Sequence, residues 1–149
     1  MDRIESFYRI AEEYCNFISD TKISIDSVPS LIELIMRLYI SALNLPEIEP
    51  ETEDALPSIS SEPLQIHFSQ QISPDYWEIF NPRTLEEPVY CNLLDDLSDI
   101  ASDLQKGMVE YQSGRIGNAV FEWRFGLNSH WGNHAVDALR ALHAIRMSG

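Results

Sequence analysis

The sequence predicts an all-helical fold, an antiparallel bundle of four to five main helices, and three observations lead to this prediction. Apolar residues recur every three or four positions over most of the chain, which is the spacing of one helix face. No alternating run and no two-residue hairpin turn stands out, so strand signals are weak. The chain has 149 residues, enough to bury about 70% of the unfolded surface. We therefore expect one helical domain over residues 1–149.

Two amphipathic helices are predicted at the N-terminus. The first is marked by apolar residues at helical spacing, namely Ile4, Phe7, Tyr8, Ala11, Tyr14, Cys15 and Ile18. Before the second, Ser30 and Glu33 have the spacing of a capping box, and residues 31–42 continue the apolar stripe. Pro46 is expected to end this helix, because proline cannot donate the next backbone hydrogen bond.

Residues 45–90 are predicted to form a long, irregular connection that is rich in proline and acidic side chains. Six of the eight prolines lie between Pro46 and Pro82. Apolar residues are interspersed with them, so part of the segment is expected to pack as a short helix that begins at Pro63. A further helical turn is expected over residues 74–82, whose aromatic side chains would form a lid packed on the bundle.

The C-terminal half is predicted to be almost wholly helical. An apolar stripe over residues 91–112 ends before Gly114, a residue type that often follows a helix end. Apolar residues recur at helical spacing again over residues 115–147. Gly126, Gly132 or both are expected to bend or split this last segment.

The composition argues against a nucleic-acid partner. The chain carries 24 Asp and Glu against 10 Lys and Arg, a formal net charge of −14. This charge repels polyanions, so we expect no direct binding of nucleic acid. From Arg115 onward the balance reverses slightly, which would suit a protein partner of mixed charge or a homo-oligomer.

Neither a membrane span nor secretion is expected. The most apolar segment, residues 31–45, is interrupted by Glu33 and Arg37, and the N-terminus has no basic region followed by an apolar stretch. Cys15 and Cys91 lack the spacing of a zinc or redox motif and suit buried thiols in a reducing compartment. We expect a cytoplasmic protein.

Three polar residues near the C-terminus are the first candidate site. His130, His134 and Asp137 are spaced by four and then three positions, so they share one helix face. Imidazole and carboxylate groups at this spacing suit Zn, Mn, Fe or Ni. The pattern lacks the glutamate of a zincin, since Trp131 follows the first histidine. We favour the simpler interpretation, in which half-buried histidines are hydrogen-bonded to Asp137 or to the backbone.

An acidic run is the second candidate. Asp95, Asp96, Asp99 and Asp103 have the spacing of the acidic helices that hold Mg²⁺ in helical nucleotide pyrophosphatases. A solvated helix face is the favoured interpretation, and basic residues that would neutralise a phosphate are scarce nearby. Asp96 or Asp99 is nevertheless a candidate for an added ligand or base beside the histidines.

Four segments together resemble a bacterial family of small domains of unknown function. These segments are residues 94–100, residues 130–143, residues 13–18 and residues 76–78. The resemblance covers nearly the whole chain and implies an all-helical fold in a cytoplasmic protein. It assigns no catalytic residue, cofactor or partner to any position of this chain.

Three hypotheses for function follow. The leading one is a helical interaction or structural domain without catalytic activity and without a predicted cofactor. The alternative enzyme is a metal-dependent hydrolase, with a divalent metal on His130, His134 and Asp137. The third is a module that binds a small apolar ligand under a lid made of Tyr76, Trp77 and Phe80.

Overall fold

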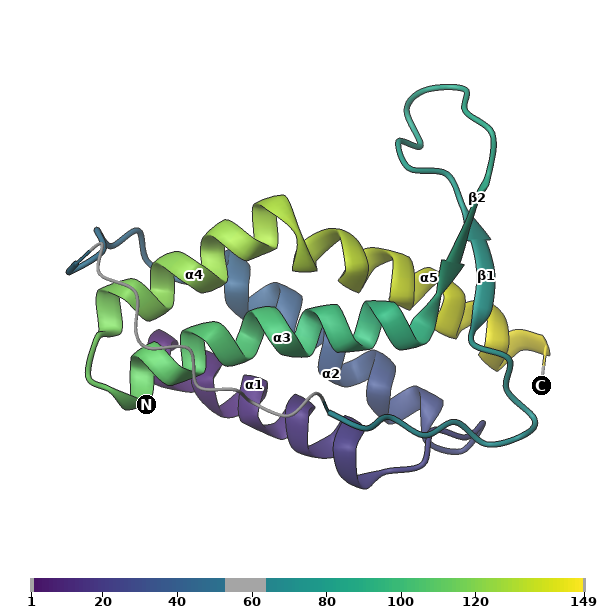
Figure 1. Cartoon of the computed structure of the whole chain (residues 1–149), viewed down its shortest axis with the longest axis horizontal. Coiled ribbons are helices and arrows are strands. Elements are labelled where there is room, and N and C mark those ends of the chain that lie inside the picture. Colours follow the sequence, from purple (N-terminus) through teal and green to yellow (C-terminus); the bar gives the residue numbers. More distant parts are fainter. Residues whose placement is uncertain (1, 53–63, 149) are drawn as a thin grey trace.

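The computed structural model describes residues 2–52 and 64–148 and contains, in these residues, five helices and one two-stranded hairpin (Figure 1). In chain order these elements are α1 (Arg3–Asp20), α2 (Val28–Leu43), β1 (Asp75–Glu78), β2 (Val89–Asn92), α3 (Leu93–Gln112), α4 (Ile116–Ser129) and α5 (Trp131–Ser148). The predicted helical bundle is thereby confirmed. The hairpin is an addition that the prediction lacked.

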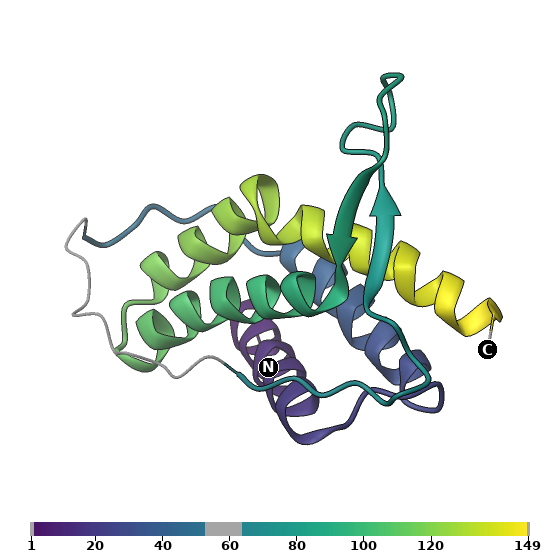
Figure 2. The same cartoon turned by 45° about the vertical axis from the view of Figure 1, so that its right-hand side comes forward.

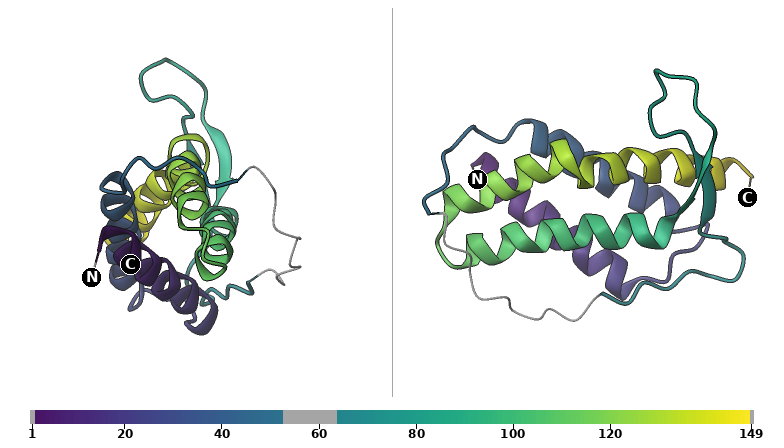
Figure 3. Two further views of the ribbon diagram at one scale, coloured as in Figure 1. Left: turned by 90° about the vertical axis from the view of Figure 1, so that its left-hand side faces the viewer. Right: turned by 45° about the horizontal axis from the view of Figure 1, so that its top comes forward.

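The five helices enclose a common core. α3 packs against α4, α5 and α1, while α2 packs against α1, α5 and α4. The end-on view in Figure 3 shows this arrangement, and α4 and α5 follow one another along the same side of the bundle (Figure 1). None of the helices described is both long enough and apolar enough to cross a bilayer.

Two buried tryptophans join the C-terminal helices to the rest of the core. The indole of Trp123 packs on Phe7, with ring centroids 4.8 Å apart, and its Nε1 donates to the carbonyl of Leu104 over 3.0 Å. Gly107 makes room for this ring, because a Cβ there would lie 2.1 Å from the indole nitrogen. Trp131 donates in turn to the carbonyl of Trp123 over 3.0 Å. The large rings are therefore placed by hydrogen bonds as well as by packing.

The start of α2 differs from the prediction. The helix begins at Val28, so Ser30 lies inside it and the expected capping box is wrong. Ser27 is the cap residue, but its hydroxyl accepts from the backbone N–H of Ser24 over 2.8 Å, in the preceding turn. Pro29 occupies the first helical turn, where a missing N–H costs nothing. The end of α2 at Leu43 agrees with the predicted stop before Pro46.

The segment predicted as a helical lid contains β1, the first strand of a β-hairpin whose loop end projects from the bundle (Figure 2). β1 pairs with β2 in antiparallel register, with Tyr76 opposite Cys91 and Trp77 opposite Tyr90. Alternation places Tyr76 inward, whereas Trp77 is 70% exposed and Phe80 is 84% exposed, so the expected burial of these two rings is wrong. Four residues are too few to reveal a two-residue period in sequence. Aromatic residues also favour strands, and this preference outweighed the helical expectation.

The predicted short helix after Pro63 is only partly tested. Pro63 itself lies outside the described residues, and residues 64–73 contain no helix. Within this stretch Phe68 forms an isolated parallel bridge with Ile23, which attaches the connection to the turn between α1 and α2.

The predicted breaks in the C-terminal half are confirmed. Gly114 follows α3 with a φ of +81°, a conformation that side chains other than glycine rarely adopt. α4 and α5 are separated at His130, whose φ of −148° and ψ of −78° leave the helical range. Gly132 allows the tight corner, since a Cβ there would lie 2.0 Å from the carbonyl oxygen of Leu127. His130 therefore occupies a helix corner directly before α5.

A candidate metal centre between α3 and α5

A stripe of polar residues runs along the contact between α3 and α5. On α3 the stripe consists of Asp96, Asp99 and Asp103, which share one face at spacings of three and four. Opposite them lie His130 at the corner and His134 on α5. The two sets meet because the chain reverses after α3, so that α4 and then α5 run back along it (Figure 1).

Two of the aspartates are buried and each holds one histidine. Asp96 is 4% exposed and Asp103 is 8% exposed, so the expected solvated face is wrong for these two carboxylates. His134 Nδ1 lies 2.7 Å from Asp96 Oδ1, and His130 Nδ1 lies 2.7 Å from Asp103 Oδ2. These two pairings make the burial of the carboxylates possible, because a buried carboxylate requires hydrogen-bond donors.

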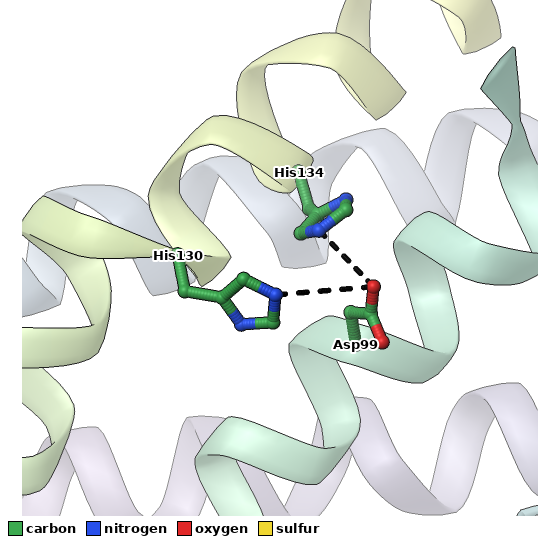
Figure 4. Close-up of side chains that lie close together, drawn as sticks. All are labelled: Asp99, His130 and His134. Atoms are coloured by element: carbon green, nitrogen blue, oxygen red, sulfur yellow. Dashed lines mark ion pairs between the residues drawn. The ribbon is translucent and has the colours of Figure 1, made fainter. Parts of the chain in front are cut away.

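The remaining ring nitrogens converge on the third carboxylate. His134 Nε2 lies 3.1 Å from Asp99 Oδ2, and His130 Nε2 lies 4.0 Å from the same oxygen. One ligand atom from each of the three residues falls within 4.8 Å of the others, and Figure 4 shows both rings directed at Asp99. A metal ion between these atoms would need only small side-chain shifts, since Zn–N and Zn–O bonds are about 2.1 Å long.

The hydrogen bonds to Nδ1 determine which nitrogen is available to a ligand. A carboxylate at Nδ1 favours the tautomer that carries its proton there, which leaves the Nε2 lone pair free. The pKa of His134 is raised, first by its hydrogen bond to Asp96 and also by the charges of Asp96, Asp99 and Asp137. Without a cation, His134 is therefore stabilised as an imidazolium between Asp96 and Asp99.

Three further groups lie around the aspartates and histidines. The hydroxyl of Tyr76, from β1, donates to Asp96 Oδ2. Asp137 lies on α5 beyond His134, and its pKa is raised to about 6 by burial and by the charges of Asp96 and Glu78. Lys106 Nζ lies 3.6 Å from Asp103 Oδ1 and offsets part of the negative charge at the other end of the stripe.

The structure brings together most of the residues proposed from sequence. His130 and His134 lie close to Asp99 and form a three-residue cluster with it. Asp96 is hydrogen-bonded to His134 Nδ1, and Asp137 lies outside the cluster. The spacing places Asp103 in the acidic run but does not predict its contact with His130. A usable signal existed, because residues 96, 99 and 103 on α3 and residues 130 and 134 have matching helical periods.

A separate groove of about 340 Å³ lies beside this network, between β1 and α5. Tyr76, Trp77 and Ile79 line it together with Arg140, while Phe80 does not take part. The aromatic segment named in the third hypothesis from sequence therefore borders a groove at the side of the hairpin and does not form a lid.

Comparison with known proteins places the chain in a family. The model of a domain of unknown function, DUF5063, matches residues 1–148. The chain belongs to this family. No curated protein matches it. The crystal structure of protein BF1032 from Bacteroides fragilis is similar to this DUF5063 chain in fold, with a TM-score of 0.76, 19% identity, and coverage of 99% of this chain and 94% of the other.

The family assignment agrees with the resemblance seen in the sequence, and the family is described only as a domain of unknown function. The matched range includes both α3 and α5, so the candidate metal centre lies inside the DUF5063 domain. At 19% identity the likeness to BF1032 concerns the fold alone.

Proposed function

We propose that this protein binds one divalent transition-metal ion through Asp99, His130 and His134. The observation that carries the proposal is the orientation of both imidazoles, each held at Nδ1 by a buried aspartate and directed through Nε2 toward Asp99. Metal-binding histidines are typically oriented by a carboxylate on the other ring nitrogen. Both second nitrogens approach the same oxygen, Asp99 Oδ2, so three ligand atoms from three residues already lie near one point.

Charge supports a cation at this position. Asp96, Asp99 and Asp103 lie within one stripe, and a divalent ion would neutralise charge that a single imidazolium offsets only in part. Two imidazole nitrogens and one carboxylate oxygen suit zinc, manganese, iron or nickel, whereas magnesium and calcium prefer oxygen ligands alone.

A non-catalytic role for the ion fits this protein best. The ligands come from α3 and from the corner that begins α5, so a bound ion would link two helices of the bundle. Metal-dependent hydrolysis is the second candidate, and the exposure of Asp99 and His130 favours it, because both are about half exposed and water could occupy an open metal position.

Metal analysis of purified protein, followed by calorimetric titration of the metal-free form with Zn²⁺ and Mn²⁺, tests the proposal. We expect one ion per chain and loss of binding in Asp99→Asn, His130→Ala and His134→Ala. His143→Ala is the matched control, since His143 is an exposed histidine of α5 outside the cluster. Absence of binding to the unmodified chain, or equal loss in the His143 variant, would contradict the proposal.

A further inference from the structure

Tyr76 connects the β-hairpin to the candidate metal centre. Resting on the metal site proposed above, we infer that Tyr76 is a positioning residue, which orients the His134 ligand through Asp96 and so raises the affinity for the ion. The residue stands twenty positions before Asp96 in the chain and reaches it from a different element.

A continuous chain of hydrogen bonds carries this inference. The Tyr76 hydroxyl donates to Asp96 Oδ2, and the other oxygen, Asp96 Oδ1, accepts from His134 Nδ1 over 2.7 Å. His134 Nε2 is then the atom directed at Asp99, 3.1 Å away. Each oxygen of the buried carboxylate thus has one donor, and the ring at the end of the chain has a single orientation.

The phenol supplies what the buried carboxylate needs. Asp96 is 4% exposed, so solvent cannot replace a lost donor at Oδ2. Asp99 and Asp137 add negative charge nearby, as their effects on the pKa of His134 indicate. Without the Tyr76 hydroxyl, the Asp96 carboxylate would be free to turn, and this change would loosen its hold on His134 Nδ1.

The hairpin holds the phenol in place. β2 leads directly into α3, and the backbone N–H of Leu93 donates to the carbonyl of Pro74 over 2.8 Å, which ties the base of the hairpin to the first turn of α3. The pairing of Tyr76 with Cys91 fixes which face of the strand meets the bundle. The hairpin therefore has a defined role as the support of this side chain.

The Tyr76→Phe variant tests the inference, with Tyr90→Phe as its matched control. Tyr90 lies on the same hairpin and donates its hydroxyl to Asp75, outside the metal centre. We expect zinc binding by the metal-free protein to weaken about tenfold in Tyr76→Phe and to change less than about twofold in Tyr90→Phe. Ring ¹⁵N shifts of His134, at one pH and without metal, should change only in Tyr76→Phe, because only this variant loosens the hydrogen bond between Asp96 and His134 Nδ1.

A double-mutant comparison shows whether Tyr76 acts through Asp96 or merely through stability. In an Asp96→Asn background, the further change Tyr76→Phe should leave zinc affinity unaltered, because the connection is already broken. Additive losses would overturn the inference, as would unchanged affinity and unchanged His134 shifts in Tyr76→Phe. A wild-type chain that binds no zinc would instead overturn the proposed function itself.

Discussion

The contact between α1 and α2 and the contact between α3 and α5 are built differently. The first buries apolar side chains, including Ile18 and Leu38, and its charged pair, Arg37 with Glu13 at 3.2 Å, remains at the surface. The second buries Asp96 and Asp103. Of the three buried polar or charged residues found in the part of the chain that the structure describes, two therefore belong to this contact.

This difference distinguishes a contact that stabilises the fold from a contact that positions functional side chains. Apolar burial stabilises a helix pair without further conditions, whereas a buried carboxylate is costly unless it is paired and hydrogen-bonded. Replacement of such a pair by apolar residues is often neutral or stabilising, so stability alone does not explain it. We infer that the α1–α2 contact maintains the bundle and that the α3–α5 contact serves binding.

The largest effect is expected from Leu38→Ala, which tests the structural half of the comparison. Leu38 is fully buried, and its truncation should reduce the free energy of unfolding by about 3 kcal/mol through lost burial and a cavity. Urea denaturation measures this loss. Zinc affinity of the folded variant should match that of the wild-type protein, and a parallel loss of affinity would break the proposed division of roles.

The next effect is expected from Asp103→Asn, which tests the binding half. An amide oxygen holds His130 Nδ1 less firmly than a carboxylate, so zinc affinity should fall roughly tenfold, equivalent to about 1.4 kcal/mol. Asp95→Asn, on the exposed face of the same helix, is the control and should bind zinc normally. Equal zinc affinities in the two variants would contradict a role of Asp103 in orienting His130 for metal binding.

A smaller effect concerns the pH dependence of the metal-free protein. The pKa of Asp137 is raised to about 6, so its ionised form is disfavoured in the folded state, and the contribution of this group to stability should fall as pH rises from about 4 to 6. Asp137→Asn lacks this titration. Its melting temperature relative to wild type should therefore rise by a few degrees over that window and stay level above it. A constant difference from pH 4 to 7.5 would contradict the assignment.

The smallest effect is expected from Arg37→Gln. This change removes the pair with Glu13 at the surface of the α1–α2 contact, where both side chains are solvated. Stability should change by less than about 0.5 kcal/mol in thermal or urea unfolding. A loss as large as that of Leu38→Ala would mean that the α1–α2 contact also depends on charge.

The long helices could be predicted because each repeats its apolar spacing over several turns, as α1 does from Phe7 to Ile18. β1 could not be predicted in this way, because its four residues, Asp75–Glu78, are too few to show a repeating pattern. The cap at Ser27 was missed because local turn bonds, rather than a capping box, precede α2. In these places local backbone geometry determines the structure, and the sequence contains no repeating pattern that is long enough to predict it.

The candidate site was predictable only in part. His130 and His134 were found from their spacing, and so was the acidic stripe on α3. Their adjacency depends on how α3 and α5 pack, and that packing is a tertiary property. The burial of Asp96 and Asp103 follows from the same packing, so the sequence alone favoured a solvated face. The contact of Tyr76 with Asp96 required the hairpin to be known.

The central claim is that His130 and His134 share one ion through their Nε2 atoms. The most direct measurement is a zinc titration of metal-free protein, followed by long-range ¹H–¹⁵N spectra of the histidine rings. We expect the Nε2 resonances of His130 and His134 to move together and to saturate at one equivalent of zinc. The rings of His67 and His143 should stay unchanged. Unmoved Nε2 resonances at His130 and His134, or shifts shared equally by all four histidines, would contradict the account.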